Sequence, residues 1–429
     1  MDTNIIYCGD NLEVLAKFKD KSIDLVYADP PFFSNRHFEI IWRNGAEMKV
    51  YADRWKGGVN VYIEWMKDRL WQCHRVLRDN GSMYLHCDWH ATHRLRVAMD
   101  DIFGEDNFRN EIVWKRATMS GAKAIGKQYG RNHDSILYYS KGKDWQYHTQ
   151  YLPYSKDYIK KKFIHKDEKG LYRLQPKGTR SDEAIAELRK QGRIVESRTG
   201  YIEIKFYLNE MKGVALDDVW LDIKDLRTIQ STEKWGYPTQ KPEALLKRII
   251  LTSSSKGDIV LDPFCGCGTT LAVAQQLDRR WVGIDVAPKA CELVRERLNK
   301  VGATNIRIIG APKSIEELKE LSDWEFQNWV IDRIGGVPSS KKADDKGVDG
   351  YTFMAREPVQ VKQSEGIGRN VIDNFETAMR RKHKTIGYIV AFSFGKGAYE
   401  EVARAKLEDN LDIKLMRVDE IDNYFASST

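Results

Sequence analysis

The sequence predicts an α/β protein whose main domain is a parallel sheet with crossover helices. Two blocks in which strand and helix patterns alternate, residues 1–114 and 236–312, predict this sheet. Between them, residues 115–235 are polar, basic and rich in turn residues, which indicates an inserted module. A new pattern begins at about Ile315 and predicts a second, small α/β domain over residues 315–429.

Length and composition are typical of a globular protein with two or three domains. The chain has 429 residues, of which 42% are hydrophobic and 31% are charged. No apolar run approaches the length of a membrane span and the N-terminus lacks a signal-peptide pattern, so we expect a cytoplasmic, nucleoid-associated protein. The six cysteines are thinly spread and are expected to be reduced. Cys265 and Cys267 lack a second pair at zinc-ligand spacing, and we interpret them as loop residues.

The first block contains a strand that ends in a rigid, acidic elbow. Residues 23–27 form an apolar run, which is followed by Ala28-Asp29-Pro30-Pro31-Phe32-Phe33. Two consecutive prolines cannot continue a sheet ladder, so the chain is expected to leave the strand as a stiff, extended segment. Asp29 then lies at the carboxyl end of a strand, the edge where open α/β sheets bind ligands. Asp10 follows a predicted strand over residues 4–8, where it either meets a ligand or caps a helix.

The elbow has the groups needed to hold a planar base that carries an exocyclic amine. Asp29 and the Pro30 carbonyl can accept two N–H bonds while Phe32 stacks on the ring. The alternative is a tight turn in which Asp29 caps a backbone amide and the aromatic rings belong to the core.

The rest of the first block continues the alternation. After a loop to about Asn60, the pattern predicts a helix over residues 61–77 and a strand over 81–87. A second helix over 90–103 and a second strand over 111–114 follow. Four residues of this stretch have side chains that can bind a metal: His86, Asp88, His90 and His93. We interpret them as strand-end and helix-cap residues, because they do not form an open-site ligand pattern.

A basic, aromatic segment lies inside the inserted module. Residues 141–180 contain eleven Lys or Arg and four Asp or Glu, a surplus of seven that equals the net charge of the whole chain. Aromatic residues are interleaved with these lysines: Tyr147, Tyr151, Tyr154, Tyr158, Phe163 and Tyr172. Basic and aromatic residues together are typical of a nucleic-acid-binding face, whereas Lys160-Lys161-Lys162 also fits a solvated helix.

The second block contains a glycine loop and an acidic strand end. Its elements are a turn bracketed by Pro238 and Pro242, a helix over 243–252, strands over 258–262 and 281–285, and a helix over 288–300. Between the two strands, the loop Pro263-Phe264-Cys265-Gly266-Cys267-Gly268-Thr269-Thr270 opens a further helix.

This layout is typical of a nucleoside site. Gly266 and Gly268 let the backbone approach the ligand, and Asp285 accepts hydrogen bonds from two ribose hydroxyls. The loop is not G-x-G-x-x-G and has no Walker lysine, which disfavours a pyrophosphate or triphosphate ligand. S-adenosylmethionine has a ribose and no phosphate, and it fits better.

The elbow and the glycine loop together resemble those of the exocyclic-amino DNA methyltransferases, which make N6-methyladenine or N4-methylcytosine. The matching residues are Asp29-Pro30-Pro31-Phe32 and Asp262-Pro263-Phe264-Cys265-Gly266-Cys267-Gly268-Thr269. The order of the motifs resembles the beta class, in which the insertion is the target-recognition domain. The resemblance implies a Rossmann-like S-adenosylmethionine-dependent sheet, a site-specific DNA methyltransferase of a restriction-modification system, double-stranded DNA as partner and a homodimer. Asp at position 29 favours adenine N6 over cytosine N4.

The resemblance also implies roles for individual residues. The target base is flipped out of the duplex and held by Asp29, Pro30, Pro31 and Phe32. Asp10 meets the adenine of S-adenosylmethionine, Thr239 and Lys241 border its methionine end, and Phe264 packs against it. The full set expected to bind this cofactor is Asp10, Thr239, Lys241, Asp262, Phe264, Gly266, Gly268, Thr269 and Asp285.

The C-terminal pattern resembles the restriction-endonuclease-like fold, in particular its Mrr-like branch. Asp349 precedes a strand that contains Gln360 and Lys362. The resemblance implies Mg²⁺ bound by Asp349, with Glu325 as a further acid and Lys362 at the attacked phosphate or the water. Gln360 stands where most of the fold has an acid, so the domain either cleaves DNA or only binds it. A protein that binds DNA without any catalysis is the alternative for the whole chain.

Overall fold

The computed structural model divides the chain into two compact units, residues 1–147 with 218–429 and residues 148–217. The residues it describes are 2–33, 37–41, 47–52, 58–116, 129–226, 232–237, 239–310, 314–334, 336–339, 347–352 and 356–421. The predicted turn residue Pro238 lies outside them. No helix within the described ranges is long and apolar enough to cross a membrane.

The first unit contains a nine-stranded sheet in the order β14-β6-β7-β5-β2-β15-β16-β1-β17. Its strands are β1 (Ile5–Cys8), β2 (Ile23–Ala28), β5 (Leu77–Cys87), β6 (Phe108–Lys115), β7 (His133–Ser140), β14 (Val219–Trp220), β15 (Ile259–Asp262), β16 (Arg280–Asp285) and β17 (Arg307–Ile309). The six strands from β5 to β17 pair in parallel, as the βα alternation predicts. β7 is antiparallel to both of its neighbours, β5 and β6.

Helices pack on both faces of this sheet. They are α1 (Asn11–Ala16), α2 (Val59–Val76), α3 (Thr92–Phe103), η1 (Glu105–Asn107), α6 (Glu243–Ser253), α7 (Thr269–Gln276) and α8 (Pro288–Lys300). The side chains of β2 alternate between the two cores, since successive strand residues point to opposite faces. Val26 belongs to the hydrophobic cluster of α2 and α3, whereas Leu25 and Tyr27 belong to that of α6, α7 and α8. Burial on both faces explains why β2 has no polar face.

Two stretches that the sequence assigned to loop or insertion form strands instead. The predicted loop before Asn60 contains an antiparallel hairpin of β3 (His37–Ile41) and β4 (Glu47–Ala52). Residues 133–140 form β7, whose Ile136 to Tyr139 side chains are buried in the main sheet. The compact inserted unit is therefore residues 148–217, narrower than the predicted 115–235.

The inserted unit has its own four-stranded sheet in the order β11-β12-β10-β9. Its elements are β8 (Tyr151–Leu152), α4 (Lys156–Lys162), β9 (His165–Asp167), β10 (Gly170–Pro176), α5 (Asp182–Lys190), β11 (Ile194–Glu196), β12 (Ile202–Tyr207), η3 (Leu208–Glu210) and β13 (Val214–Ala215). Part of the predicted aromatic face is internal packing, because the Tyr154 and Tyr158 rings stack at 4.9 Å and Phe163 is buried. Tyr147, in the first unit, and Tyr151 are exposed.

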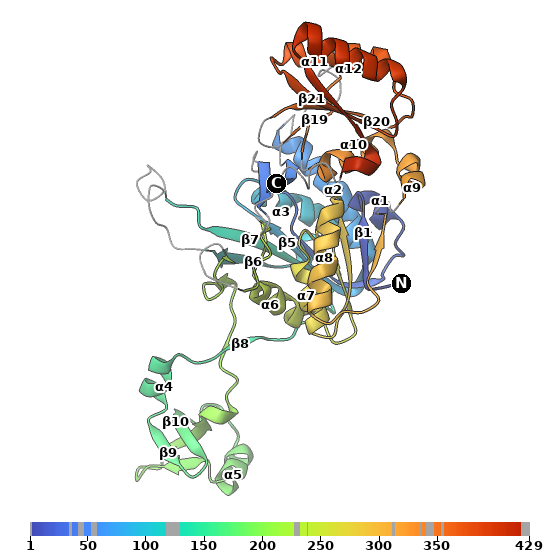
Figure 1. The fold of residues 1–429 in the computed structure, drawn as a ribbon. Coiled ribbons are helices and arrows are strands. Elements are labelled where there is room, and N and C mark those ends of the chain that lie inside the picture. The colour runs from blue at the N-terminus through green and yellow to red at the C-terminus, as the bar shows by residue number, and fades with distance from the viewer. Residues whose placement is uncertain are drawn as a thin grey trace. The chain divides into compact units, whose positions relative to one another are not determined.

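The C-terminal part of the first unit carries a separate five-stranded sheet in the order β18-β19-β20-β21-β22. Its elements are α9 (Ile315–Glu320), α10 (Asp323–Arg333), β18 (Val337–Pro338), β19 (Gly350–Tyr351), β20 (Pro358–Lys362), α11 (Arg369–Arg381), β21 (Ile386–Ala391), α12 (Lys396–Asp409), β22 (Asp412–Arg417) and η5 (Val418–Glu420). Figure 1 shows α11 and α12 side by side on this sheet. They pack around Ile389, whereas α10 packs on the opposite face around Val390. These residues form a small α/β layer within the first unit, and a separate C-terminal domain stays a prediction.

Candidate active site

A cavity of about 510 Å³ lies at the carboxyl edge of four adjacent strands, β2, β15, β16 and β1. Each of these strands delivers to the cavity the residues that directly follow it. The predicted site residues that line it are Asp10, Asp29, Pro31, Thr239, Lys241, Asp262, Phe264, Gly266, Thr269 and Asp285. Pro30, Phe32 and Gly268 are not among the lining residues. The volume is in the range of small-molecule sites, which is about 300–1,000 Å³.

Asp29 of the elbow is paired with Lys241. The Lys241 ammonium donates a hydrogen bond to Oδ2 of Asp29 and a second one, of 3.3 Å, to the carbonyl oxygen of Thr239. Oδ1 of Asp29 is buried and has no hydrogen-bond partner in the described part of the chain. Asp29 therefore does not cap a backbone amide there, contrary to the alternative reading of the turn. An orphaned carboxylate oxygen at a cavity wall is available to accept an N–H from a ligand.

Phe32, an aromatic residue of the elbow, packs on a buried histidine. Its ring stacks on His86, with centroids 5.6 Å apart and planes 28° apart. His86 Nδ1 is 2.8 Å from the Tyr27 hydroxyl, and His86 Nε2 is 3.2 Å from the Asp134 carboxylate. Burial opposes the ionisation of Asp134, but His86 and Arg116 outweigh it and hold the pKa of this carboxyl below its ordinary value. His86 thus supports the elbow.

The other residues of the predicted histidine cluster have separate contacts. Nδ1 of His90 is 2.7 Å from a carboxylate oxygen of Asp88, and that carboxylate also accepts the His90 backbone N–H. His93 is exposed on α3. Among the described residues, these histidines and Asp88 do not form a group of three or more side chains close enough to hold one metal ion.

Backbone N–H groups, one of them in the glycine loop, hold the Asp285 carboxylate. The backbone N–H of Gly266 donates to Oδ2 of Asp285 at 2.8 Å, and that of Ala287 donates to Oδ1 at 3.0 Å. Gly268 has φ of +72°, and a Cβ atom there would lie 2.8 Å from a methyl group of Val294 on α8. Glycine is thus required at position 268 by helix packing, and this residue faces away from the cavity.

Two buried acids lie in the cavity wall. Burial raises the pKa of Asp262 to about 7 and that of Asp285 to about 6. The neighbouring charge of Asp29 raises the pKa of Asp262 further. A cationic ligand would favour the ionised form of both acids.

Asp10 is held by an arginine that sequence reasoning missed. Nη2 of Arg69 donates to both carboxylate oxygens of Asp10, at 2.9 and 2.7 Å, and Asp10 also caps α1 through the Leu12 N–H. The Arg69 guanidinium lies 3.8 Å from the ring centroid of Trp65, which lines the cavity close to Phe264. Trp65 and Arg69 are four residues apart on α2, so they lie on one face of this helix. This spacing is the only sequence signal for the contact, and it fits ordinary core packing equally well.

In the C-terminal sheet, Asp349 and Lys362 come from neighbouring strand segments. Oδ2 of Asp349 accepts the Val361 N–H at 2.7 Å, and burial raises the pKa of Asp349 although Lys362 opposes this. Gln360 is buried, and its Oε1 has no hydrogen-bond partner within the described ranges. The Glu325 carboxylate accepts hydrogen bonds from the backbone N–H and hydroxyl of Ser322, at the start of α10. Glu325 therefore forms hydrogen bonds at the N-terminus of α10, and these hydrogen bonds occupy the carboxylate that was predicted as a further acid of the nuclease-like site.

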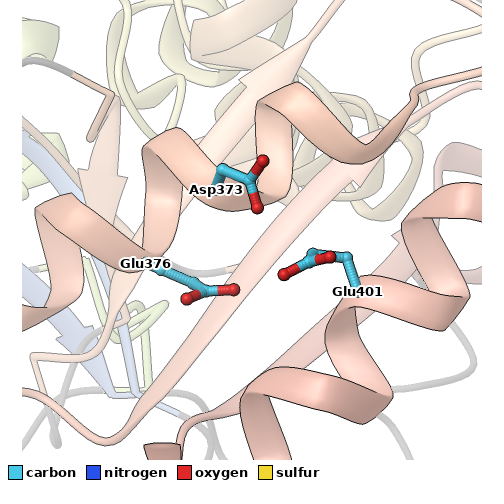
Figure 2. Close-up of side chains that lie close together, drawn as sticks. All are labelled: Asp373, Glu376 and Glu401. Atoms are coloured by element: carbon cyan, nitrogen blue, oxygen red, sulfur yellow. The ribbon is translucent and has the colours of Figure 1, made fainter.

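A second acidic group of the same domain lies between α11 and α12. Figure 2 shows Asp373, Glu376 and Glu401, whose ligand atoms all lie within 4.8 Å of one another. Arg404 donates to both Glu376 oxygens at 2.9 Å, and Arg369 is 2.6 Å from Glu401. Because arginines neutralise the two buried carboxylates, this group is an ion-pair network that ties the two helices together.

Comparison with known proteins identifies a matching family and similar proteins. Residues 23–296 match the N6 and N4 DNA methylase family. The type II methyltransferase M.EcaI of Enterobacter cloacae is 30% identical over 301 residues, which are 65% of this chain and 65% of that protein. The DNA adenine methyltransferase YhdJ of Escherichia coli is 30% identical over 298 residues, 70% of this chain and 83% of that protein. A solved complex of M1.HpyAVI with SAM superposes with a TM-score of 0.39 at 19% identity, over 69% of this chain and 99% of that one.

Proposed function

Because the chain belongs to the N6 and N4 DNA methylase family, we propose that it transfers a methyl group from S-adenosylmethionine to the exocyclic amine of a DNA base. The observation that carries this proposal is the orphaned Oδ1 of Asp29 at the wall of the cavity that also receives the glycine loop and Asp285. One cavity thus combines an acceptor for the amine with a nucleoside-type site.

The lining residues fit S-adenosylmethionine. Asp285 is oriented by two backbone N–H groups and has lone pairs left for ribose hydroxyls. Phe264 and Trp65 supply apolar surface, and the loop holds no lysine for a phosphate. When bound, this molecule supplies an electrophilic methyl group on a sulfonium. The ionised forms of Asp262 and Asp285 complement such a cation.

The elbow positions the amine. A base must leave the duplex to reach the cavity, at a cost of a few kcal/mol of stacking. Phe32, supported by His86, offers a stacking surface, and Asp29 with the Pro30 carbonyl accepts the two amine N–H bonds. The nitrogen lone pair forms a bond to the methyl carbon, the carbon–sulfur bond breaks, and its electron pair stays on a neutral sulfur. The amine then loses one proton to the solvent.

Adenine N6 is the proposed target atom. Asp29 at the first position of the elbow favours adenine, and the Escherichia coli relative is named a DNA adenine methyltransferase. The second candidate is cytosine N4. Digestion of DNA methylated by the protein, followed by identification of the modified nucleoside, separates the two.

The test of the reaction is Asp29→Ala in the full chain. We expect transfer of labelled methyl to DNA to be lost while S-adenosylmethionine still binds in isothermal titration, because Asp29 acts on the amine. Asp101→Ala, at an exposed position on α3, is the control and should remain active. Undiminished transfer by Asp29→Ala refutes the assignment, and a wild-type chain that shows no binding heat is a DNA-binding protein only.

The basic inserted unit is proposed to recognise the target in double-stranded DNA. Its exposed lysines on α4 suit phosphate contacts. Replacing Lys160, Lys161 and Lys162 by Ala should weaken DNA binding and reduce its salt dependence. Pairing of two chains into a homodimer, as the resemblance implies, stays a prediction for analytical ultracentrifugation.

For the C-terminal domain we propose a nuclease-like site made of Asp349, Gln360 and Lys362. The buried acid beside a lysine favours Mg²⁺-dependent cleavage, with DNA binding alone as the second candidate. Mg²⁺-dependent nicking that disappears in Lys362→Ala but persists in Lys396→Ala supports cleavage. If the wild type does not nick DNA, the second candidate, DNA binding without cleavage, is the function of this domain.

A further inference from the structure

We propose that helix α10 of the C-terminal domain forms part of the wall of the S-adenosylmethionine site and that Asn328 contacts the adenosine half of this donor. The proposal rests on the function proposed above. It makes the C-terminal domain a component of the methylation site.

The cavity is lined by three residues from the C-terminal part of the chain. Asn328 and Ile331 of α10 and Gly336, shortly after it, share the lining with Asp285 and Asp10. Residues 328 and 331 are three positions apart and so lie on one face of the helix. Phe326 and Val330 are buried in the C-terminal hydrophobic cluster, so α10 connects that core to the cavity.

An ion pair and the path of α8 place α10 at the Asp285 end of the cavity. Arg333 of α10 is 3.5 Å from Glu292 of α8. α8 begins at Pro288, and Pro288 and Val286 both line the cavity directly after Asp285. Since Asp285 is the proposed ribose acceptor, α10 covers the adenosine half of the donor, away from the Asp29 elbow.

The chemistry of this wall suits a purine. Val286 lines the cavity and is 50% exposed, so it has apolar surface to offer to a ligand. Asn328 is half-buried and lines the cavity. An amide has two donors and one acceptor oxygen, which match the donor and acceptor edge of adenine.

Donor binding and the position of α10 are then coupled. A ligand that contacts both α10 and the glycine loop favours the arrangement in which the two are together, and by linkage that arrangement binds the ligand more tightly. Donor binding should therefore slow hydrogen exchange in α10.

The experiment measures donor affinity and hydrogen exchange in the full chain, with S-adenosylmethionine as the probe. Asn328→Ala should weaken binding about three- to tenfold, the effect of one lost hydrogen bond. The matched control is Asn374→Ala, an exposed asparagine on α11, which should bind as the wild type does. Arg333→Glu should weaken binding about twofold, and adding Glu292→Arg should restore it. In the wild type, amides of residues 323–333 should exchange more slowly with donor present.

The outcomes separate this inference from the proposed function. If the wild type binds no S-adenosylmethionine, both fail. If it binds the donor, but Asn328→Ala has wild-type affinity and α10 exchange is unchanged, α10 is not part of the site and the proposed function stands. Equal weakening by Asn374→Ala would show a general effect on the domain and would also overturn the inference.

Discussion

The ammonium of Lys241 is paired with the carboxylate of Asp29, although the two residues are 212 positions apart in the sequence. The pair occupies Oδ2 of Asp29 and leaves Oδ1 as the unpartnered atom. Lys241 Nζ also lies 5.0 Å from the centroid of the Phe32 ring. One lysine therefore contacts both the acid and the aromatic ring of the elbow, and it sets which carboxylate oxygen can accept an N–H.

Lys241→Met should lower the rate of methyl transfer about tenfold or more. Hydrogen bonds to charged groups contribute about 1.5–3 kcal/mol, and without Lys241 the Asp29 carboxylate is free to rotate. The measurement is single-turnover transfer of labelled methyl at saturating donor. Lys247→Met, an exposed lysine on α6, is the control and should keep the wild-type rate. A wild-type rate in Lys241→Met would mean that the pair has no part in orienting Asp29.

His86→Leu should destabilise the fold by about 3 kcal/mol. The change removes a hydrogen-bond partner from two buried groups, the Tyr27 hydroxyl and the Asp134 carboxylate. Thermal unfolding by calorimetry gives the comparison, with the exposed His93→Leu as the control. When Asp134→Leu is added to His86→Leu, the further loss of stability should be smaller than the loss that Asp134→Leu causes in the wild type. The reason is that the Asp134 carboxylate has already lost its hydrogen bond to His86. Additive losses would contradict a shared network.

Asp262→Asn should stabilise the donor-free protein more at pH 8 than at pH 4. The folded pKa of Asp262, about 7, lies above the ordinary value of 3.8, so the folded state holds the proton more tightly than the unfolded state does. The stability contributed by this group is therefore fully present below about pH 4 and is lost as the pH rises to about 7. Asparagine mimics the neutral acid at every pH.

The measurement is the Tm difference between Asp262→Asn and wild type across this pH range. The difference should grow as the pH rises. A difference that shrinks with rising pH would mean that Asp262 is stabilised in its charged form.

Gly268→Ala should destabilise the protein by about 2–5 kcal/mol. The left-handed backbone costs about 1–2 kcal/mol for a residue with Cβ, and overlap with Val294 adds about 1–3 kcal/mol. Gly257→Ala is the matched control, because φ there is +82° and no atom lies within 4 Å of the added Cβ. Calorimetry should give the order wild type, Gly257→Ala, Gly268→Ala in falling Tm. Val294→Ala should restore part of the loss, and equal effects at both glycines would exclude the packing contact.

Much of the site was predictable because its residues directly follow strands. Asp262 and Asp285 end strands of one parallel sheet, Asp10 and Asp29 closely follow two others, and the carboxyl ends of such strands meet at one edge. Other members come from helices or from the antiparallel strand β7. Sequence analysis missed Trp65 and Asp134. Trp65 is an aromatic residue on a helix face and Asp134 lies in a strand within a polar stretch, and neither pattern indicates a ligand site locally.

Local geometry follows from residue types alone: the proline elbow after β2, the glycine loop before α7 and the βα order. Proline and glycine restrict or free their own backbone whatever surrounds them. Folding of the whole chain is what pairs Lys241 with Asp29, places His86 and Asp134 beneath Phe32, and brings α10 to the cavity. These contacts join distant segments and depend on burial, which the packing of the whole chain creates and no local pattern encodes.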